Sequence, residues 1–186
     1  MYINLIILFS GLILASFANM LIYRLPRSLS IISPRSFCTN CKKQLSSKQL
    51  LPLLGFLLSK GTCSFCRCKI PIRYILVELI IPIGFLFITH QFGLTFIAFK
   101  LAFFFYFSTI LLFTDLETQL LPNSITYLIT SSGLLFFTIE HLAVKAVLGL
   151  LTGFVTFYLI AVVGKLVYKK DVIGGGDIKL AAGIGA

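Results

Sequence analysis

The sequence predicts an all-α membrane protein with about six transmembrane helices and a small cysteine-rich loop. Hydrophobic residues make up 58% of its 186 residues, and the mean hydropathy is +1.02. These values are far above those of an ordinary soluble domain. The apolar residues form runs of the length that a bilayer core of about 30 Å requires. Most of the basic residues lie together between the first two runs.

Five apolar runs are candidate transmembrane helices, and a sixth is shorter. The sixth begins at about Asp177, and its ten residues would rise only about 15 Å as a helix. We therefore expect the last helix to be truncated or to be completed by a partner. Lys100 lies inside the third run, so we expect that helix to tilt or to begin after residue 92. The five runs span residues 3–22, 74–90, 92–114, 124–140 and 142–164.

The distribution of charge predicts the orientation in the membrane. Residues 24–73 hold ten of the sixteen Lys and Arg residues, and no acidic residue precedes Glu78. Because positively charged loops stay in the cytoplasm, we expect the N-terminus outside and residues 24–73 inside. No basic residue precedes the first run, so we expect that it is not a cleavable signal peptide. We divide the chain into a first helix (1–23), a cytoplasmic loop domain (24–73) and a membrane-embedded domain (74–186).

The net charge of +10 raises the question of nucleic-acid binding. Most of this charge lies in the single loop, and no stripe of basic residues alternates with aromatic ones. Anionic lipid headgroups beside a cytoplasmic loop explain the charge better. We expect the lipid bilayer, and no nucleic acid, as a partner.

All five cysteines lie in this loop, within the stretches "CTNC" and "CSFCRC". Disulfides are rare in the cytosol, so the thiols are available as metal ligands. Two CxxC pairs separated by 21 residues are typical of a structural zinc site, because each turn presents two thiolates to one tetrahedral ion. The expected ligands are Cys38, Cys41, Cys63 and Cys66. Cys68 is an alternative to Cys66, although we expect it to be free.

The apolar stretch at residues 49–61 lies between the two cysteine pairs. Pro52 and Gly55 interrupt it, and it is too short to span a bilayer. We expect an interfacial segment that lies on the membrane.

Two aspartates fall at cytoplasmic helix ends. Asp115 follows an apolar run and precedes Pro122, which forces the helix to break or restart. Asp177 follows three glycines, Gly174–Gly176, and precedes an apolar segment. Three glycines together indicate a sharp turn or a close approach of another chain. Each aspartate could be only a helix cap, but an ionisable group at membrane depth usually has a function.

The two aspartates favour aspartic-protease chemistry. One carboxylate of a close pair keeps its proton while the other acts as a base toward water. Cysteine catalysis has no cytoplasmic histidine to support it, since His90 and His141 are expected on the opposite face.

Five motifs in order along the chain resemble those of the type IV prepilin peptidases, also called leader peptidase/N-methyltransferases. The first is "GLILASFANMLIYRLP", which is similar to the family's G-x-x-x-x-S-F-x-N-V-x-x-x-R-x-P helix. The paired CxxC loop and the R-Y-x-x-x-E pattern of "IPIRYILVEL" follow it. The last two are "DLETQLLPNSIT" and "GGGDIKL", which contains the family's G-x-G-D motif.

The resemblance implies a bacterial inner-membrane enzyme that cleaves the basic leader of prepilins or pseudopilins at the cytoplasmic face. It places the catalytic pair at Asp115 and Asp177, with Gly174, Gly175 and Gly176 in the active-site loop. It also implies N-methylation of the new N-terminus with S-adenosylmethionine, for which no glycine-rich cofactor loop is evident in the sequence. Two other functions remain open: a non-enzymatic membrane scaffold with a zinc-binding loop, and a presenilin-like protease that cuts within the bilayer.

Overall fold

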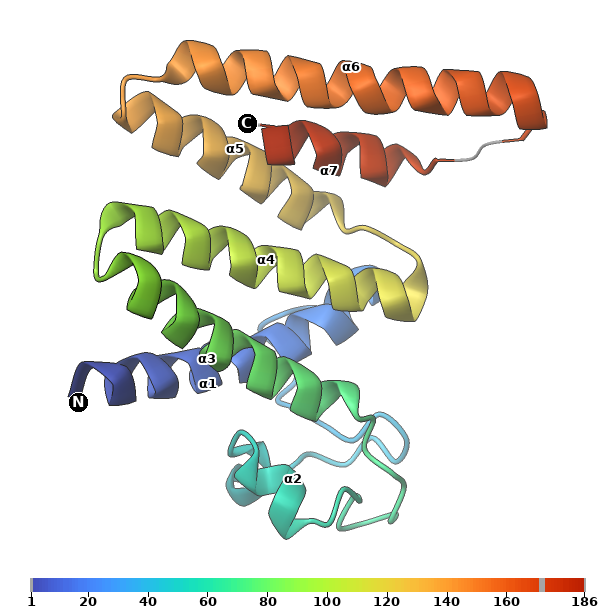
Figure 1. Ribbon diagram of the computed structural model, residues 1–186. Coiled ribbons are helices and arrows are strands. Elements are labelled where there is room, and N and C mark those ends of the chain that lie inside the picture. Colours follow the sequence, from blue (N-terminus) through green and yellow to red (C-terminus); the bar gives the residue numbers. More distant parts are fainter. Residues whose placement is uncertain (1, 171–172, 186) are drawn as a thin grey trace. The chain divides into compact units, whose positions relative to one another are not determined.

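The computed structural model describes residues 2–170 and 173–185, without the side chains of residues 47 and 48 (Figure 1). Each expected apolar run forms a helix, and the described residues contain no strand. The fold class predicted from the sequence is therefore confirmed. The six main helices are α1 (Tyr2–Arg24), α3 (Arg73–Phe92), α4 (Phe96–Thr118), α5 (Asn123–Ile139), α6 (Ala143–Tyr168) and α7 (Gly175–Gly185).

Four of these helices, α1, α3, α4 and α6, are long and apolar enough to cross a membrane. The 17 residues of α5 rise about 25 Å, slightly less than a bilayer core, and the 11 residues of α7 rise about 16 Å. Helix α4 begins at Phe96, later than residue 92 as expected, and the Lys100 ammonium lies over the Phe96 ring at 5.6 Å. The break expected at Pro122 is also confirmed, because Pro122 is the N-cap residue of α5.

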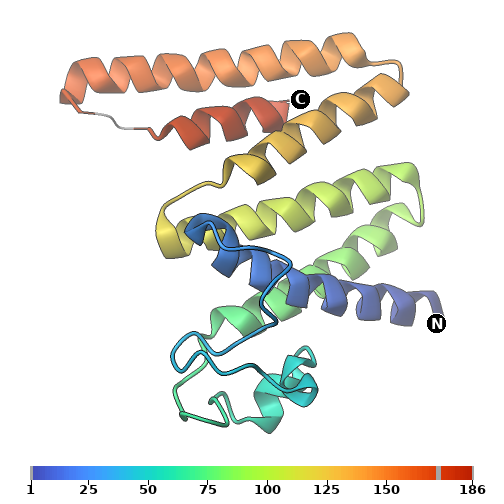
Figure 2. The same cartoon turned by 180° about the vertical axis from the view of Figure 1, so that it is seen from behind.

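The chain divides into two compact units, Met1–Glu117 and Thr118–Ala186. In the first unit, α1 crosses α3 and packs against it (Figure 2). Small residues on α1 allow this contact: a side chain at Gly11 would lie 2.7 Å from the Cα of Pro82. Close packing through small residues is the usual way in which membrane helices associate. The fully buried residues of this contact are Ala15, Ala18, Ile22, Val77 and Ile81.

Helix α4 joins the first unit through aromatic side chains. The Tyr106 hydroxyl donates to the carbonyl of Leu14 on α1 at 3.1 Å. The Phe105 ring meets the ring of Phe85 on α3 at a centroid distance of 6.5 Å.

The segment between α1 and α3 is mostly irregular. It contains two short 3₁₀ helices, η1 (Leu25–Arg27) and η2 (Ser47–Leu50), and one short α-helix, α2 (Leu54–Leu58). Arg24, which is only 4% exposed, fixes the start of this loop. Its guanidinium donates to the carbonyls of Ser30, at 2.7 Å, and Pro34.

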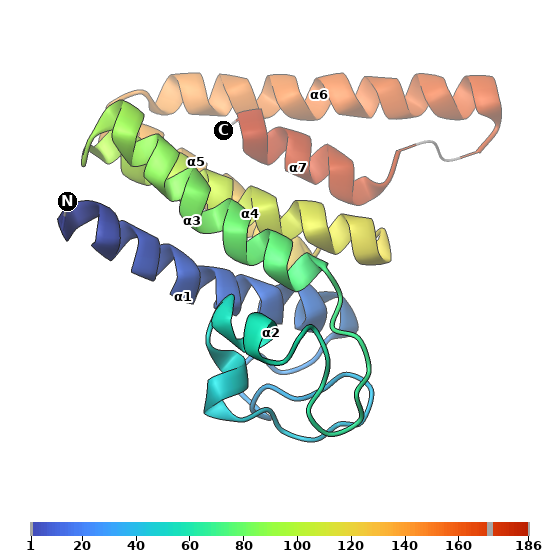
Figure 3. The same cartoon turned by 60° about the horizontal axis from the view of Figure 1, so that its bottom comes forward.

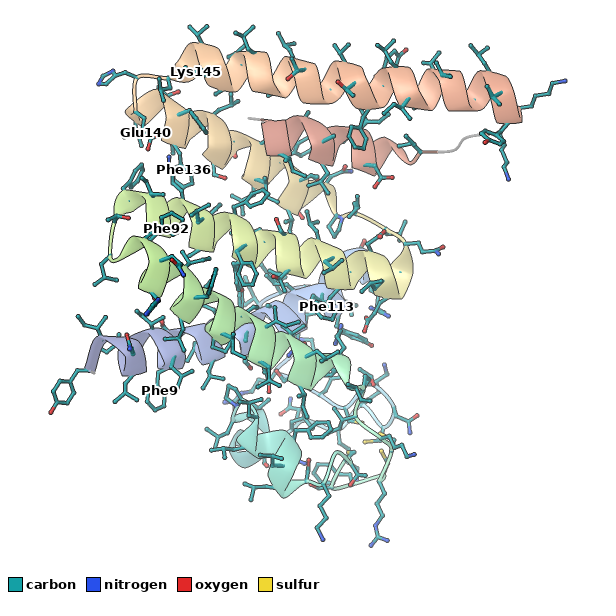
Figure 4. All side chains as sticks on the ribbon, in the orientation of Figure 1. Phe9, Phe92, Phe113, Phe136, Glu140 and Lys145 are labelled. Carbon is teal, nitrogen blue, oxygen red and sulfur yellow. The ribbon has the colours of Figure 1, made fainter. Side chains whose placement is uncertain are left out.

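In the second unit, α7 packs against both α5 and α6 (Figure 1). The contact with α6 consists of small residues at a spacing of four, Gly149 and Gly153, which face Gly185 and Ala181 on α7. A side chain at either glycine of α6 would collide with the backbone of α7. This is the small-xxx-small packing of membrane helices. The rest of α6 projects apolar side chains outward, and Ala146 is its only buried residue (Figure 4).

Candidate active site and cysteine cluster

The first cysteine turn has a closed backbone pattern. The N–H of Cys38 donates to the carbonyl of Lys43, and the N–H of Lys42 donates back to the carbonyl of Cys38, both at 2.9 Å. Lys42 has a left-handed φ of 60°, and an antiparallel bridge between Phe37 and Gln44 closes the base of the turn. This fold turns the side chains of a C-x-x-C pair toward one side.

The second turn repeats the first, with every position shifted by 25 residues, from Cys38 to Cys63. The N–H of Cys63 donates to the carbonyl of Cys68, and the N–H of Arg67 donates to the carbonyl of Cys63, again at 2.9 Å. Arg67 has a φ of 55°, and the bridge joins Thr62 to Lys69. The loop therefore contains the same turn twice. The C-x-x-C spacing alone does not reveal this repeat.

The two turns bring four thiols together. The sulfur atoms of Cys38, Cys41, Cys63 and Cys66 all lie within 4.8 Å of one another. A tetrahedral zinc ion with Zn–S bonds of about 2.3 Å separates its sulfur ligands by about 3.8 Å. The distance between the Cys38 and Cys66 sulfur atoms is 3.8 Å. The four cysteines can therefore hold a metal ion, and the sulfur atoms of the loop gather at one place in Figure 4.

Cys68 is a fifth thiol beside this cluster. Its sulfur lies 3.3 Å from that of Cys66 and 3.6 Å from that of Cys38. In the second turn, however, Cys68 occupies the position that Lys43 has in the first turn. The backbone carbonyl of the residue at this position accepts the N–H of the first cysteine of its turn. The duplication thus distinguishes Cys66, the counterpart of Cys41, from Cys68.

The thiols differ strongly in acidity. The backbone N–H of Cys68, and then its thiol, stabilise the Cys66 thiolate and lower the pKa of Cys66 to about 6. The same neighbours have the opposite effect on Cys68: hydrogen bonding with Cys66 and Cys38 raises the pKa of Cys68 to about 12.

Asp115 is exposed in the last turn of α4. Two residues further on, the carboxylate of Glu117 accepts from the buried guanidinium of Arg73 at 3.0 Å. Arg73 is the first residue of α3, so this ion pair joins the start of α3 to the end of α4. Asp115 therefore lies at the end of α4 that meets the start of α3, where the cysteine loop ends. No motif or spacing in the sequence indicates this pair, whose members are 44 residues apart.

Asp177 is exposed in the first turn of α7. Its carboxylate oxygen Oδ2 accepts from the backbone N–H of Gly174 at 3.1 Å, and its own N–H donates to the carbonyl of Gly174 at 3.1 Å. This is half of a capping box, in which a side chain in the first turn satisfies the N–H of the N-cap residue. One carboxylate oxygen of Asp177 is thus used in capping.

The three glycines before Asp177 differ in their surroundings. A side chain at Gly176 would lie 3.0 Å from the Cβ of Leu121, whereas one at Gly175 would meet nothing within 4 Å. None of the three has a positive φ. A close approach, and not a left-handed turn, is therefore what the structure shows at Gly176.

The start of α7 is fixed beside the start of α5. The Lys179 ammonium donates to the side-chain carbonyl of Asn123 at 3.0 Å and lies over the Tyr127 ring at 5.7 Å. On its other side, α7 forms a groove of about 560 Å³ with α6, and Asp177 lies in its lining. The remaining lining residues are Thr152, Gly153, Thr156, Phe157, Leu180, Ala181 and Ile184.

The other acidic residues lie elsewhere. Glu78 is buried in α3, where it accepts from the backbone N–H of Leu53. Glu140 is the C-cap residue of α5, just before the turn into α6. Lys145 lies near the start of α6 (Figure 4). Asp171, which we interpret as a solvated loop acid, lies outside the described residues.

Known proteins resemble the chain over nearly its whole length. Residues 9–92 match the bacterial peptidase A24 N-terminal domain, and residues 102–186 match the type IV leader peptidase family. A prepilin leader peptidase/N-methyltransferase of Neisseria gonorrhoeae is 32% identical, with 95% of this chain and 71% of the relative covered. Proteins of the same description from Vibrio cholerae and Bacillus subtilis are 35% and 34% identical, over 97% and 94% of this chain and 76% and 69% of the relatives. No solved structure matches the chain significantly.

The helices and the cysteine cluster define a multi-pass membrane protein with a metal-binding type of loop between its first two membrane helices. Together with the matches above, they show that the chain belongs to the prepilin leader peptidase/N-methyltransferase family. The resemblance inferred from the five sequence motifs is thereby confirmed, and with it the expectation of a membrane-bound peptidase.

Proposed function

We propose that this chain is an aspartic endopeptidase that removes the basic leader of prepilins or pseudopilins, with Asp115 and Asp177 as its catalytic pair. The relatives are named for leader cleavage. Asp115 opens the family-like motif D-L-E-T-Q-L-L-P-N, and Asp177 is the acidic residue of G-G-G-D.

One observation carries the pairing of the aspartates. Asp115 lies in the last turn of α4, before residues 119–122, which connect α4 to α5. Asp177 begins α7, whose Lys179 is bonded to Asn123, the first residue after the same connection. Each unit therefore has its aspartate at the end where the connection enters or leaves it.

Two carboxylates at such a position supply acid and base in one step. The ionised carboxylate takes a proton from water, and the protonated one donates a hydrogen bond to the scissile carbonyl. The free oxygen of Asp177 is available for this role, because only Oδ2 is used to cap α7. The groove between α6 and α7, which includes Asp177, offers a largely apolar surface for the chain that follows the leader.

The metal of the cysteine cluster is proposed to be zinc in a structural role. Four thiolates fill a tetrahedral shell and leave no position for a water nucleophile. A loop with little core of its own gains its fold from such an ion. The names of the relatives also include N-methylation. We extend this activity to the chain with S-adenosylmethionine as the methyl donor, and assign no residue to it.

The proposed orientation has the N-terminus outside and the loop inside, in the cytoplasmic membrane of a bacterium. Ten basic residues in residues 24–73 support it. The Arg73–Glu117 ion pair adds that the end of α4 lies on the same side as the loop. The basic leader of the precursor would thus meet both aspartates from the cytoplasm.

The test uses the purified full chain and a prepilin that carries a basic leader and an apolar helix. Mass spectrometry of the products locates the cut. A cut at the junction between leader and apolar helix supports the proposal. A cut within the apolar helix favours a presenilin-like protease, and an uncut substrate favours a scaffold.

A further inference from the structure

The segment from Leu50 to Leu58 lies beside the membrane helices and not beyond their ends. The N–H of Leu53 donates to the carboxylate oxygen Oε2 of Glu78 at 2.7 Å. Glu78 follows Arg73, the first residue of α3, by five residues, which is about 7.5 Å along the helix. The contact thus lies more than one turn inside the charged end of α3.

A cavity that both the segment and α1 line also places the segment beside α1. Leu50 and Pro52 line a cavity of about 360 Å³ together with residues of α1. One of these, Ser16, precedes the charged end of α1 at Arg24 by eight residues, about 12 Å along the helix. In Figure 3 the loop that carries α2 lies on the side of the first unit formed by α1 and the start of α3. The other α1 residues at this cavity are Ile13, Phe17 and Met20.

At this depth, α2 turns a leucine face outward. Leu54, Leu57 and Leu58 are 55%, 67% and 73% exposed, and their i, i+3, i+4 spacing puts them on one side of the helix. The opposite side faces the loop: Gly55 is buried against the backbone of Gln49, and the Phe56 ring packs on Gly61. The exposed leucines therefore form a single apolar surface.

Several backbone N–H groups of the segment donate to protein acceptors, among them those of Leu53, Gly55 and Leu57. Leu53 has a φ of 60° and a ψ of −50°, a conformation that aims its N–H at Glu78. The N–H of Gly55 donates to Leu51 at 2.7 Å, and that of Leu57 donates to Leu53 at 3.0 Å. Irregular backbone is tolerated at membrane depth only when protein groups satisfy it in this way.

We infer that residues 50–58 form a re-entrant segment whose leucine surface lies among the lipid acyl chains of the leaflet next to the cysteine loop. The charges agree with this position: no charged residue occurs between Lys48 and Lys60, and a basic residue at each end suits anionic headgroups. Interfacial helices bury their apolar faces about 5–10 Å below the headgroups, which agrees with the depth of Glu78. The segment therefore holds the cysteine cluster against the membrane surface.

The chain has no tryptophan, so a single introduced tryptophan reports its own surroundings. The test replaces Leu57→Trp and, separately, Leu58→Trp in the full chain, reconstituted in bilayers whose acyl chains carry bromine. Bromine quenches only tryptophans that lie among the acyl chains. The matched control is Phe65→Trp, a residue that is 52% exposed in the second cysteine turn.

Both leucine variants are expected to show blue-shifted emission and strong quenching, most of all by bromine near the carbonyl end of the acyl chain. The control is expected to stay unquenched. Equal quenching at Leu57, Leu58 and Phe65 would overturn the inference. So would emission that is shielded already in detergent and insensitive to brominated lipid, since a second protein copy would then cover the leucines. Leader cleavage measured on the same preparations tests the proposed function independently of the quenching.

Discussion

Arg73 and Glu117 form a salt bridge of 3.0 Å in which the Arg73 side chain is 7% exposed and that of Glu117 is 29% exposed. The pair joins the first residue of α3 to the last turn of α4. It also lies between two features of the proposed site, since the cysteine loop ends at Arg73 and Asp115 is two residues from Glu117. The position of the first aspartate relative to the loop therefore depends on this contact.

Glu117→Gln should destabilise the first unit. The substitution leaves the buried Arg73 charge without its counter-ion, which costs about 3–5 kcal/mol for fully buried pairs. Because Glu117 is partly exposed, we expect about 1–3 kcal/mol. Thermal unfolding in detergent measures the effect. The double variant R73M/E117L, which removes both charges, should be more stable than E117Q alone. A double variant that is less stable than E117Q would contradict this account.

The duplicated cysteine turns predict which thiols are ligands. Cys63→Ser should abolish stoichiometric metal binding, whereas Cys68→Ser should keep it, because Cys68 corresponds to Lys43 in the first turn. Elemental analysis of protein purified without chelator measures both. Metal binding displaces protons from thiols, so affinity should fall as the pH falls, by up to about tenfold per pH unit for each proton displaced. Metal-free wild-type protein would refute the site.

The helices could be predicted from the sequence because apolar runs of this length adopt few structures other than membrane helices. The clustering of Cys38, Cys41, Cys63 and Cys66 could also be predicted, since C-x-x-C spacing depends on local geometry alone. Even the late start of α4 followed from one residue, Lys100, whose charge is unfavourable at depth.

Contacts between distant segments could not be predicted in the same way. Nothing in the spacing of Arg73 and Glu117, or of Leu53 and Glu78, indicates a pair, because their meeting depends on how whole helices pack. Glu78, the last residue of the R-Y-x-x-x-E pattern, accepts from a backbone N–H of the loop. The contact between α6 and α7 is different: its G-x-x-x-G spacing at Gly149 and Gly153 was a readable signal that our sequence reasoning missed.

Gly153→Leu should disturb the second unit. Its side chain would collide with the backbone of Ala181 and push α7, with Asp177, away from α6. Overpacking of this kind costs about 1–3 kcal/mol, and leader cleavage should fall with it. The control is Val155→Leu, at a residue of the same helix that is 48% exposed. Cleavage that is equally reduced in both variants would show that the small-residue contact is not the cause.

Glu78→Leu should loosen the loop. It removes the acceptor of the Leu53 N–H, and an unpaired buried donor costs about 1–3 kcal/mol. Glu78→Gln keeps an acceptor oxygen and should restore most of the loss. Limited proteolysis reports the effect, with faster cutting between residues 45 and 62 in the leucine variant alone. Identical digestion of the two variants would show that the hydrogen bond does not anchor the segment.

Substitutions at Asp177 separate its catalytic role from its role as a helix cap. Asp177→Asn retains an oxygen that can accept from Gly174, so α7 keeps its cap. The amide can no longer exchange a proton, however, and loss of acid–base help costs about 10²–10⁴-fold in rate. We expect D177N and D115N to lose leader cleavage to this extent while metal content and thermal stability are unchanged. The wild-type rate should follow a bell-shaped pH profile that belongs to the pair.

The controls for this experiment are Asp177→Ala and Asp171→Asn. D177A removes both the cap and the carboxylate. If Asp177 belongs to the catalytic pair, D177N and D177A should be equally inactive. If Asp177 acts only as a cap, D177A should instead lose stability and activity, and D177N should keep both. D171N, six residues from Asp177, should cleave at nearly the wild-type rate. Near-normal cleavage by D177N would therefore assign Asp177 to the helix cap and remove it from the catalytic pair.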